Sequence, residues 1–61
     1  MSAAVPVDSI EPGDIVRASY VPNQIVTHVT RDGKGRYVIR TEFEIHYDPD
    51  TLIELVRKVG T

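Results

Sequence analysis

The sequence predicts a small, mainly β domain, and two features carry that prediction. Residues 24–47 contain two runs in which apolar and polar residues alternate, and the pair Asp32-Gly33 lies in the short segment between them. An Asp-Gly pair between two β-type runs is a strong signal for a hairpin. Between Tyr37 and Tyr47, apolar side chains favour one parity and charged side chains the other, as in a strand with one buried and one exposed face.

Length restricts the chain to one domain. Its 61 residues include no cysteine, so disulfides and thiolate metal sites are excluded. A chain of this size buries only about 60% of its unfolded surface, and such domains often depend on a metal or a partner chain. We therefore expect a partly disordered N-terminal arm at residues 1–9, a single domain at residues 10–59, and self-association as one option.

Composition predicts a soluble protein of the cytoplasm. Hydrophobic residues make up 41% of the chain and charged residues 26%, which is ordinary for a folded soluble domain. No apolar run approaches the roughly 18 residues of a membrane span. The first residues also lack the basic segment and apolar core of a signal peptide. We expect no contact with a membrane.

The first expected elements are a turn and a strand. Residues 11–14 read Glu-Pro-Gly-Asp, in which proline presets φ and glycine accepts the positive φ of a type II turn. Asp14 is expected to bond neighbouring backbone, which is a structural role. Residues 15–21 then form a strand whose apolar parity, expected to face the core, consists of Val16, Ala18 and Tyr20.

The second strand is expected at residues 25–31, after a break at residues 21–24. Pro22 has no amide hydrogen for a sheet and Asn23 tolerates left-handed φ. The pattern in residues 25–31 scarcely distinguishes the two faces, and we expect Ile25 and Val29 to point inward.

Residues 36–47 are longer than a common strand of about five or six residues. We expect two strands here that meet at a tight turn or sharp bend near residues 40–42. No glycine, proline, asparagine or aspartate marks that turn.

The last segment, residues 48–59, has two interpretations. Asp48 suits a helix N-cap, Pro49 suits the first helical position and Gly60 suits the position after the end. The apolar residues of this segment also have helical spacing. Intrinsic signals alone therefore favour a short C-terminal helix, which would cap a β-meander.

Three short motifs favour a closing strand instead. Residues 49–56, Pro-Asp-Thr-Leu-Ile-Glu-Leu-Val, resemble the end of SH3-like barrels, where a single 3₁₀ turn precedes the last strand. Residues 12–16 resemble the first strand of bacterial SH3-like domains, and residues 31–40 are similar to the middle hairpin of small actinobacterial SH3-like proteins. The resemblance covers most of residues 10–57 and implies a five-stranded SH3-like barrel. It transfers no binding residues, because the aromatic peptide-binding pairs of eukaryotic SH3 domains are missing.

The residues offer little for catalysis. His28 and His46 are the side chains expected to titrate near neutral pH, but their separation matches no metal-ligand spacing. Glu42 and Glu44 share a strand face with His46, so we expect them to raise its pKa. Residues 33–35, Gly-Lys-Gly, do not complete a phosphate-binding loop. We expect no enzymatic activity, no cofactor, no metal and no small-molecule substrate.

Binding is the function class that the sequence favours. We expect a small protein-interaction module, or a regulatory accessory protein of phage or bacterial type, that binds another protein or itself. Its candidate interface is the apolar C-terminal set Leu52, Ile53, Leu55, Val56 and Val59. The alternative is nucleic-acid binding by the basic hairpin, since residues 24–40 carry four basic residues against one acidic, whereas the whole chain has a net charge of −2. The candidate phosphate contacts are Arg31, Lys34, Arg36 and Arg40, with Tyr37 as a stacking platform.

Overall fold

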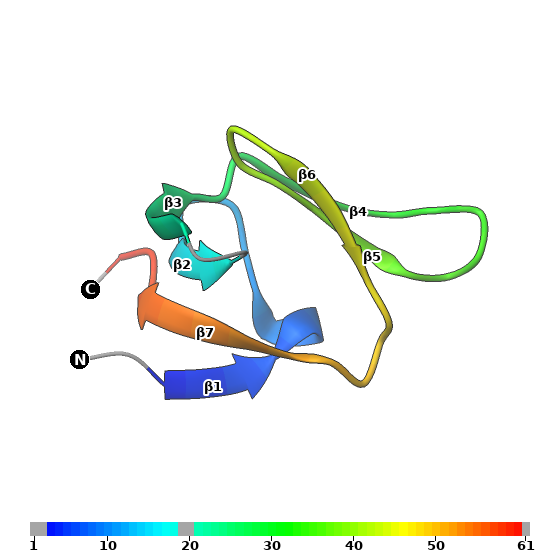
Figure 1. The fold of residues 1–61 in the computed structure, drawn as a ribbon, viewed down its shortest axis with the longest axis horizontal. Coiled ribbons are helices and arrows are strands. Elements are labelled where there is room, and N and C mark those ends of the chain that lie inside the picture. The colour runs from blue at the N-terminus through cyan, green and yellow to red at the C-terminus, as the bar shows by residue number, and fades with distance from the viewer. Residues whose placement is uncertain (1–2, 19–20, 61) are drawn as a thin grey trace.

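The computed structural model describes residues 3–18 and 21–60, which form two antiparallel sheets (Figure 1). The first sheet has the order β1 (Ala3–Pro6), β7 (Leu52–Arg57), β2 (Ile15–Ala18) and β3 (Val21–Ile25). The second has the order β4 (His28–Arg31), β5 (Tyr37–Arg40) and β6 (Glu44–Tyr47). A 3₁₀ helix, η1 (Val7–Ser9), follows β1. The prediction of a mainly β domain is confirmed.

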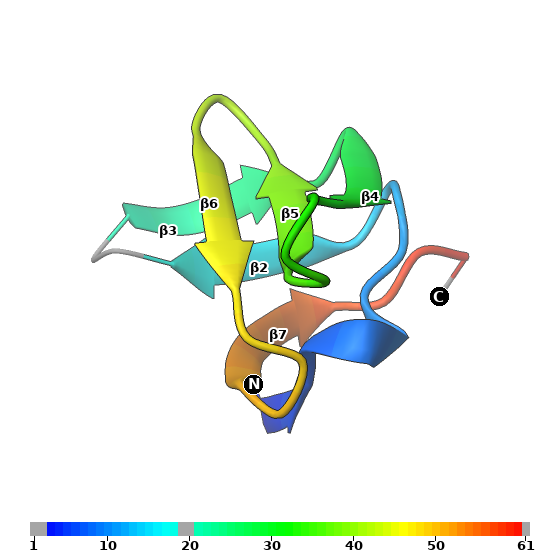
Figure 2. The same cartoon turned by 90° about the vertical axis from the view of Figure 1, so that its right-hand side faces the viewer.

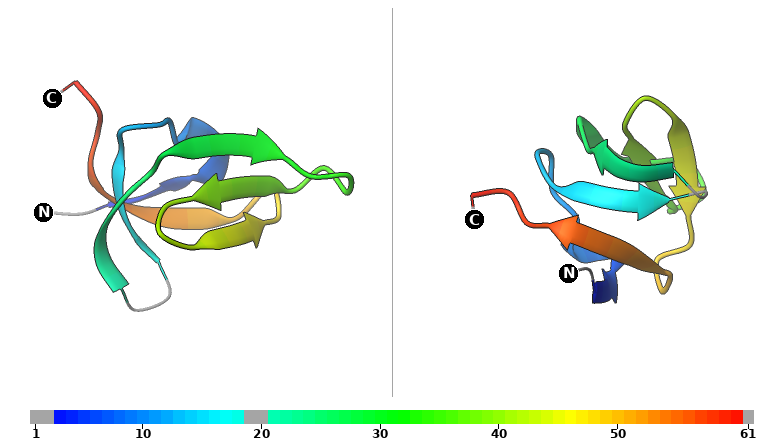
Figure 3. Two further views of the ribbon diagram at one scale, coloured as in Figure 1. Left: turned by 90° about the horizontal axis from the view of Figure 1, so that it is seen from above. Right: turned by 60° about the vertical axis from the view of Figure 1, so that its left-hand side comes forward.

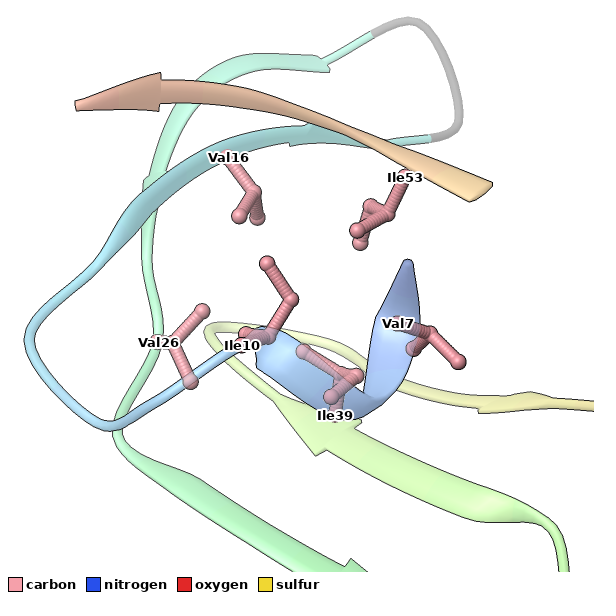
Figure 4. Packing of buried hydrophobic residues seen from close by; sticks show 6 residues of the cluster. All are labelled: Val7, Ile10, Val16, Val26, Ile39 and Ile53. Carbon is pink, nitrogen blue, oxygen red and sulfur yellow. The ribbon is translucent and has the colours of Figure 1, made fainter. Parts of the chain in front are cut away.

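The core lies between the two sheets, whose strands run across one another (Figure 2). Each sheet and the loops beside it contribute buried aliphatic side chains to one cluster (Figure 4). Complete burial of one such side chain stabilises the fold by about 1.5–3 kcal/mol. The buried apolar set is Val7, Ile10, Val16, Val26, Ile39 and Ile53.

The central hairpin forms as predicted. β4 pairs with β5, and the turn is closed by the N–H of Asp32 donating to the carbonyl of Arg36 (3.0 Å) and that of Gly35 donating to Asp32 (3.1 Å). Gly35 has φ +79°, a conformation that glycine adopts without a steric cost. β5 then pairs with β6, so that Tyr37 faces Tyr47 on the core side of the sheet.

The turn between β5 and β6 is also confirmed, although no glycine or proline marks it. The backbone N–H of Thr41 donates to the carbonyl of Phe43 (2.8 Å), and the N–H of Phe43 donates to the Thr41 hydroxyl (3.1 Å). The threonine side chain thus supplies an acceptor that usual turn residues would otherwise provide.

The expected break at residues 21–24 is wrong, because these residues belong to strand β3. β3 lies at the edge of its sheet, where a proline is tolerated. The inward orientation expected for Ile25 is also wrong, since its side chain is 60% exposed whereas Val26 is buried. The backbone N–H of Val26 donates to the backbone carbonyl of Asp14 (2.8 Å), and this contact holds Val26 over the core. Val29 packs against the core as predicted.

Of the two interpretations of residues 48–59, the closing strand is confirmed, because strand β7 stands where the short C-terminal helix would lie. β7 pairs with β1 on one side and β2 on the other, so two partners satisfy its backbone hydrogen bonds. A hydrogen-bonded turn precedes it, with the N–H of Thr51 donating to Asp48 (3.0 Å). Within the segment predicted as an N-terminal arm, residues 3–9 form β1 and η1. Residues 1–2 and Tyr20 lie outside the described residues.

Seven strands are present in the described ranges where five were expected, and within those ranges the two sheets do not close into a barrel (Figure 3). Among residues 3–18 and 21–60, the structure contains no helix with the length and apolar character needed to cross a lipid bilayer.

Candidate interaction surfaces

Asp14 is a buried carboxylate that ties the first turn to the end of the chain. It accepts hydrogen bonds from the N–H of Glu11 (2.8 Å), the N–H of Val59 (2.8 Å) and the ammonium of Lys58 (3.0 Å). Burial raises the pKa of Asp14, but the hydrogen bonds from Val59, Glu11 and Lys58 outweigh burial, so the pKa lies below its usual range. Asp14 therefore bonds neighbouring backbone, as the sequence predicts, and in addition bonds the C-terminal segment.

The β4–β5 turn and β6 are joined by a chain of charged groups. Asp32 accepts from the backbone N–H groups of Lys34 (2.8 Å) and Arg36 (2.9 Å) and from Arg36 Nε (2.9 Å). His46 then lies between two carboxylates, with Nδ1 2.8 Å from Asp32 and Nε2 3.1 Å from Glu44. Glu44 in turn accepts from Arg40 (2.9 Å).

These contacts shift the pKa values of the groups involved. The pKa of His46 is raised, first by Asp32 and then by Glu44, because both carboxylates favour the protonated ring. The pKa of Asp32 is lowered chiefly by His46, and so is that of Glu44, with Arg40 adding to the effect. Sequence reasoning identified Glu44 but missed Asp32, which lies fourteen positions before His46. Glu42, which was also expected to raise the pKa of His46, is not among the groups that shift it.

The four predicted phosphate contacts do not gather on one surface. Arg31 donates to the carbonyl of Gly35 (3.0 and 2.7 Å) and lies 4.1 Å above the ring of Tyr37. Arg36 pairs with Asp32, and Arg40 pairs with Glu44, as described above. Arg31 shares the sheet face of Tyr37, its register partner, whereas Arg40 has the opposite parity on β5. Within the described residues, the Lys34 ammonium makes no ion pair.

The predicted apolar interface is divided between the inside and the outside of the domain. Leu52 is 61% exposed and Val59 is also exposed, whereas Ile53 is buried in the core. Leu55 and Val56 are half-buried, and Leu55 packs against the core. Only part of this set is therefore available to a partner.

A hollow that sequence reasoning missed lies between β3 and the β5–β6 turn. Its volume is about 330 Å³, and its lining consists of Val21, Asn23, Gln24, Ile25, Thr27, Thr41 and Glu42. Phe43, at the same turn, is 48% exposed. One signal was available in the sequence. Ile25 and Val26 are adjacent, so if both lie in extended backbone only one of them faces the core.

Gln24 forms a fixed floor for this hollow. Its amide nitrogen donates to the carbonyls of Ala18 (2.7 Å) and Val21 (2.9 Å), and its amide oxygen accepts from the Thr41 hydroxyl (2.7 Å). The side chain is buried and its polar atoms are all engaged. The first sheet is thereby joined to the β5–β6 turn.

Comparison with protein-family models, curated protein sequences and solved structures gives no match.

The outer face of the second sheet carries a smaller hollow of about 250 Å³, lined by His28, Thr30, Val38, Arg40 and Glu44. His28 Nδ1 lies 3.1 Å from the Thr27 hydroxyl. Among the described residues, no group of three or more histidine, aspartate or glutamate side chains is arranged to hold a metal ion.

Proposed function

We propose that this chain is a small, non-enzymatic interaction module that binds another protein through the hollow beside β3. The observation that carries the proposal is the exposure of apolar side chains around a concave site on an edge strand. Ile25 is 60% exposed and lines the hollow together with Val21, and Phe43 is exposed at the neighbouring turn. Exposed apolar groups that gather beside a cavity are typical of binding sites, whereas single exposed apolar residues are ordinary.

The rigidity of the floor supports the same proposal. The three hydrogen bonds of Gln24 hold the lining of the hollow before any partner arrives. A site that is already ordered loses less conformational entropy when it binds, which favours affinity.

We also infer that the architecture is related to the SH3-like barrel. β3 and β4 are consecutive and are separated only by Val26 and Thr27, so they count as one bent strand shared by both sheets. If β3 and β4 are counted as one strand and β1 is left out, the seven strands correspond to the five of such a barrel. The hydrogen-bonded turn before β7 is a further point in support.

A pull-down from native lysate with matched variants tests the function. Ile25→Glu places a charge at the hollow, whereas Leu52→Glu makes the same change at an equally exposed side chain on β7, two strands away from β3. We expect a prey that survives nuclease treatment, is lost with Ile25→Glu and is retained with Leu52→Glu. Prey that both variants retain would contradict the proposal, and prey lost only with Leu52→Glu would move the interface to β7.

Sedimentation equilibrium separates a foreign partner from a second copy. We expect a monomer at hundreds of micromolar. A dimer that Ile25→Glu dissociates would make the partner a second copy of this chain, and a dimer that Leu52→Glu dissociates would support the predicted C-terminal interface.

Nucleic-acid binding by the hairpin is the second proposal. Its support is the exposed Lys34 at the turn and the guanidinium of Arg31 over Tyr37. If Lys34 and Arg31 both contact phosphate, log K falls with log salt with a slope of about −1 to −2. Fluorescence anisotropy with a labelled single-stranded oligonucleotide measures this slope, and binding that does not respond to salt contradicts the proposal.

A further inference from the structure

The charge around the hollow indicates the chemistry of its partner. Glu42 is exposed, and among the described residues it is the only charged one that lines the hollow. Within residues 3–18 and 21–60, its carboxylate makes no ion pair. The nearest basic residue in sequence, Arg40, is already paired with Glu44 (2.9 Å). A partner therefore meets apolar walls, formed by Ile25 and Val21, and one uncompensated negative charge.

We propose that the hollow binds a short extended segment of another protein that presents an apolar side chain beside a lysine or arginine. The inference rests on the proposed function and names its partner class. The apolar side chain fills the space against Ile25, and the cation lies against Glu42. A charge at the rim of an interface contributes mainly to specificity and association rate, so the cation selects among apolar segments.

The size of the hollow favours a side-chain anchor. Its volume of about 330 Å³ is near the lower end of the roughly 300–1,000 Å³ found for small-ligand sites. A space of this size takes one or two side chains, so the remainder of the segment lies over the rim.

The edge of β3 disfavours continuous strand pairing with a second copy. Pro22 lacks an amide hydrogen, and Asn23 has φ +56°, which departs from extended backbone. An added strand would therefore find an interrupted row of hydrogen-bonding groups along β3. A segment anchored by its side chains therefore fits this edge better than the paired β3 strands of a dimer.

Selection from a phage-displayed random peptide library tests the inference. Peptides of about nine residues have an extended length of roughly 30 Å, which is comparable to the longest dimension of the domain, 32 Å. Selections are made in parallel against the wild type, Glu42→Lys, Asp50→Lys and Ile25→Glu. Asp50 is an exposed acid in the turn before β7, so its variant makes the same change in net charge away from the hollow. Circular dichroism checks that each variant is folded.

We expect the wild type and Asp50→Lys to enrich peptides with a lysine or arginine within three positions of an apolar residue. Glu42→Lys should enrich aspartate or glutamate at those positions, and Ile25→Glu should enrich neither. For one recovered peptide, Glu42→Lys should raise Kd by about 1.5- to fivefold, in the range expected of an exposed charge pair.

The outcomes separate the two proposals. Apolar peptides that depend on Ile25 but keep the same charge preference with Glu42→Lys would overturn the partner chemistry and leave the binding site in place. Peptides that bind Ile25→Glu as well as the wild type, or no enrichment against the wild type, would overturn both.

Discussion

The imidazole of His46 lies 2.8 Å from the carboxylate of Asp32 through Nδ1, and its other nitrogen lies 3.1 Å from Glu44. Ionised carboxylates only accept hydrogen bonds, whereas a neutral imidazole has one N–H. Both contacts are therefore hydrogen bonds only when His46 is protonated. When His46 is protonated, it joins the turn between β4 and β5 to β6 through both carboxylates.

The first prediction concerns pH and stability. Because the folded pKa of His46 is raised above 6.5, its stabilising contribution is complete below the unfolded pKa and is lost as pH rises through the folded pKa. We expect the urea midpoint to fall across that interval, and the fall to be smaller in His46→Gln. The measurement is urea unfolding at a series of pH values, and equal pH profiles for the two proteins would contradict the prediction.

The second prediction assigns the cause of the raised pKa. Asp32→Asn removes the carboxylate that contributes most, so the pKa of His46 should move back toward 6.5. Glu42→Gln should leave it unchanged, because Glu42 lies in the β5–β6 turn and is not among the groups that shift the pKa of His46. NMR titration of the His46 ring protons measures both. A larger effect of Glu42→Gln would restore the expectation drawn from the sequence.

The third prediction concerns the buried carboxylate of Asp14. Asp14→Ala leaves the backbone N–H groups of Glu11 and Val59 without their acceptor, and each orphaned group costs about 1–3 kcal/mol if it stays buried. We expect the free energy of unfolding to fall by at least that amount in urea titrations. Asp50→Ala, at an exposed position, serves as the control and should change it by less than about 0.5 kcal/mol. Equal effects would show that the Asp14 contacts contribute nothing.

The fourth prediction uses two glycines. A Cβ on Gly13, which has φ +97°, would lie 2.6 Å from Cγ2 of Val59, whereas a Cβ on Gly33 would meet no atom within 4 Å. Gly13→Ala should therefore lower the free energy of unfolding by more than about 1 kcal/mol, through strain and the displaced C-terminal segment. Gly33→Ala should change it by less than about 1 kcal/mol in either direction. Thermal unfolding compares the two, and a more damaging Gly33→Ala would contradict the structure.

The elements that were predicted correctly are those whose causes lie close together in the sequence. The hairpin after Arg31 follows from Asp32 and Gly35, which bond groups within four positions of themselves. The strand at residues 15–18 and the inward side of β5 follow from alternation alone. Turn-forming residues and the two-residue alternation of a strand can both be recognised from a short stretch of sequence, without information on the segments that pack against it.

The incorrect predictions, and the choice between helix and strand for residues 48–59, concern residues whose surroundings come from distant segments. β7 has the spacing of a helix, but it is flanked by β1 and β2, and pairing with both outweighs intrinsic helix propensity. Ile25 and Val26 are equally apolar, and the backbone of Asp14 decides which of them is buried. In the candidate site, the sequence indicates that one of Ile25 and Val26 is exposed, but the buried Gln24, which was predicted to lie in a break between strands, is identified only by the position of β3.

The sequence by itself determined that this chain is a mainly β domain organised around one glycine-bearing hairpin, because those signals depend on nearest neighbours. Tertiary structure alone decided that the C-terminal segment is a strand, that His46 meets Asp32, and that Glu42 borders a hollow beside β3. Each of these depends on long-range packing, which satisfies backbone groups and buries apolar surface in ways that local propensity does not encode.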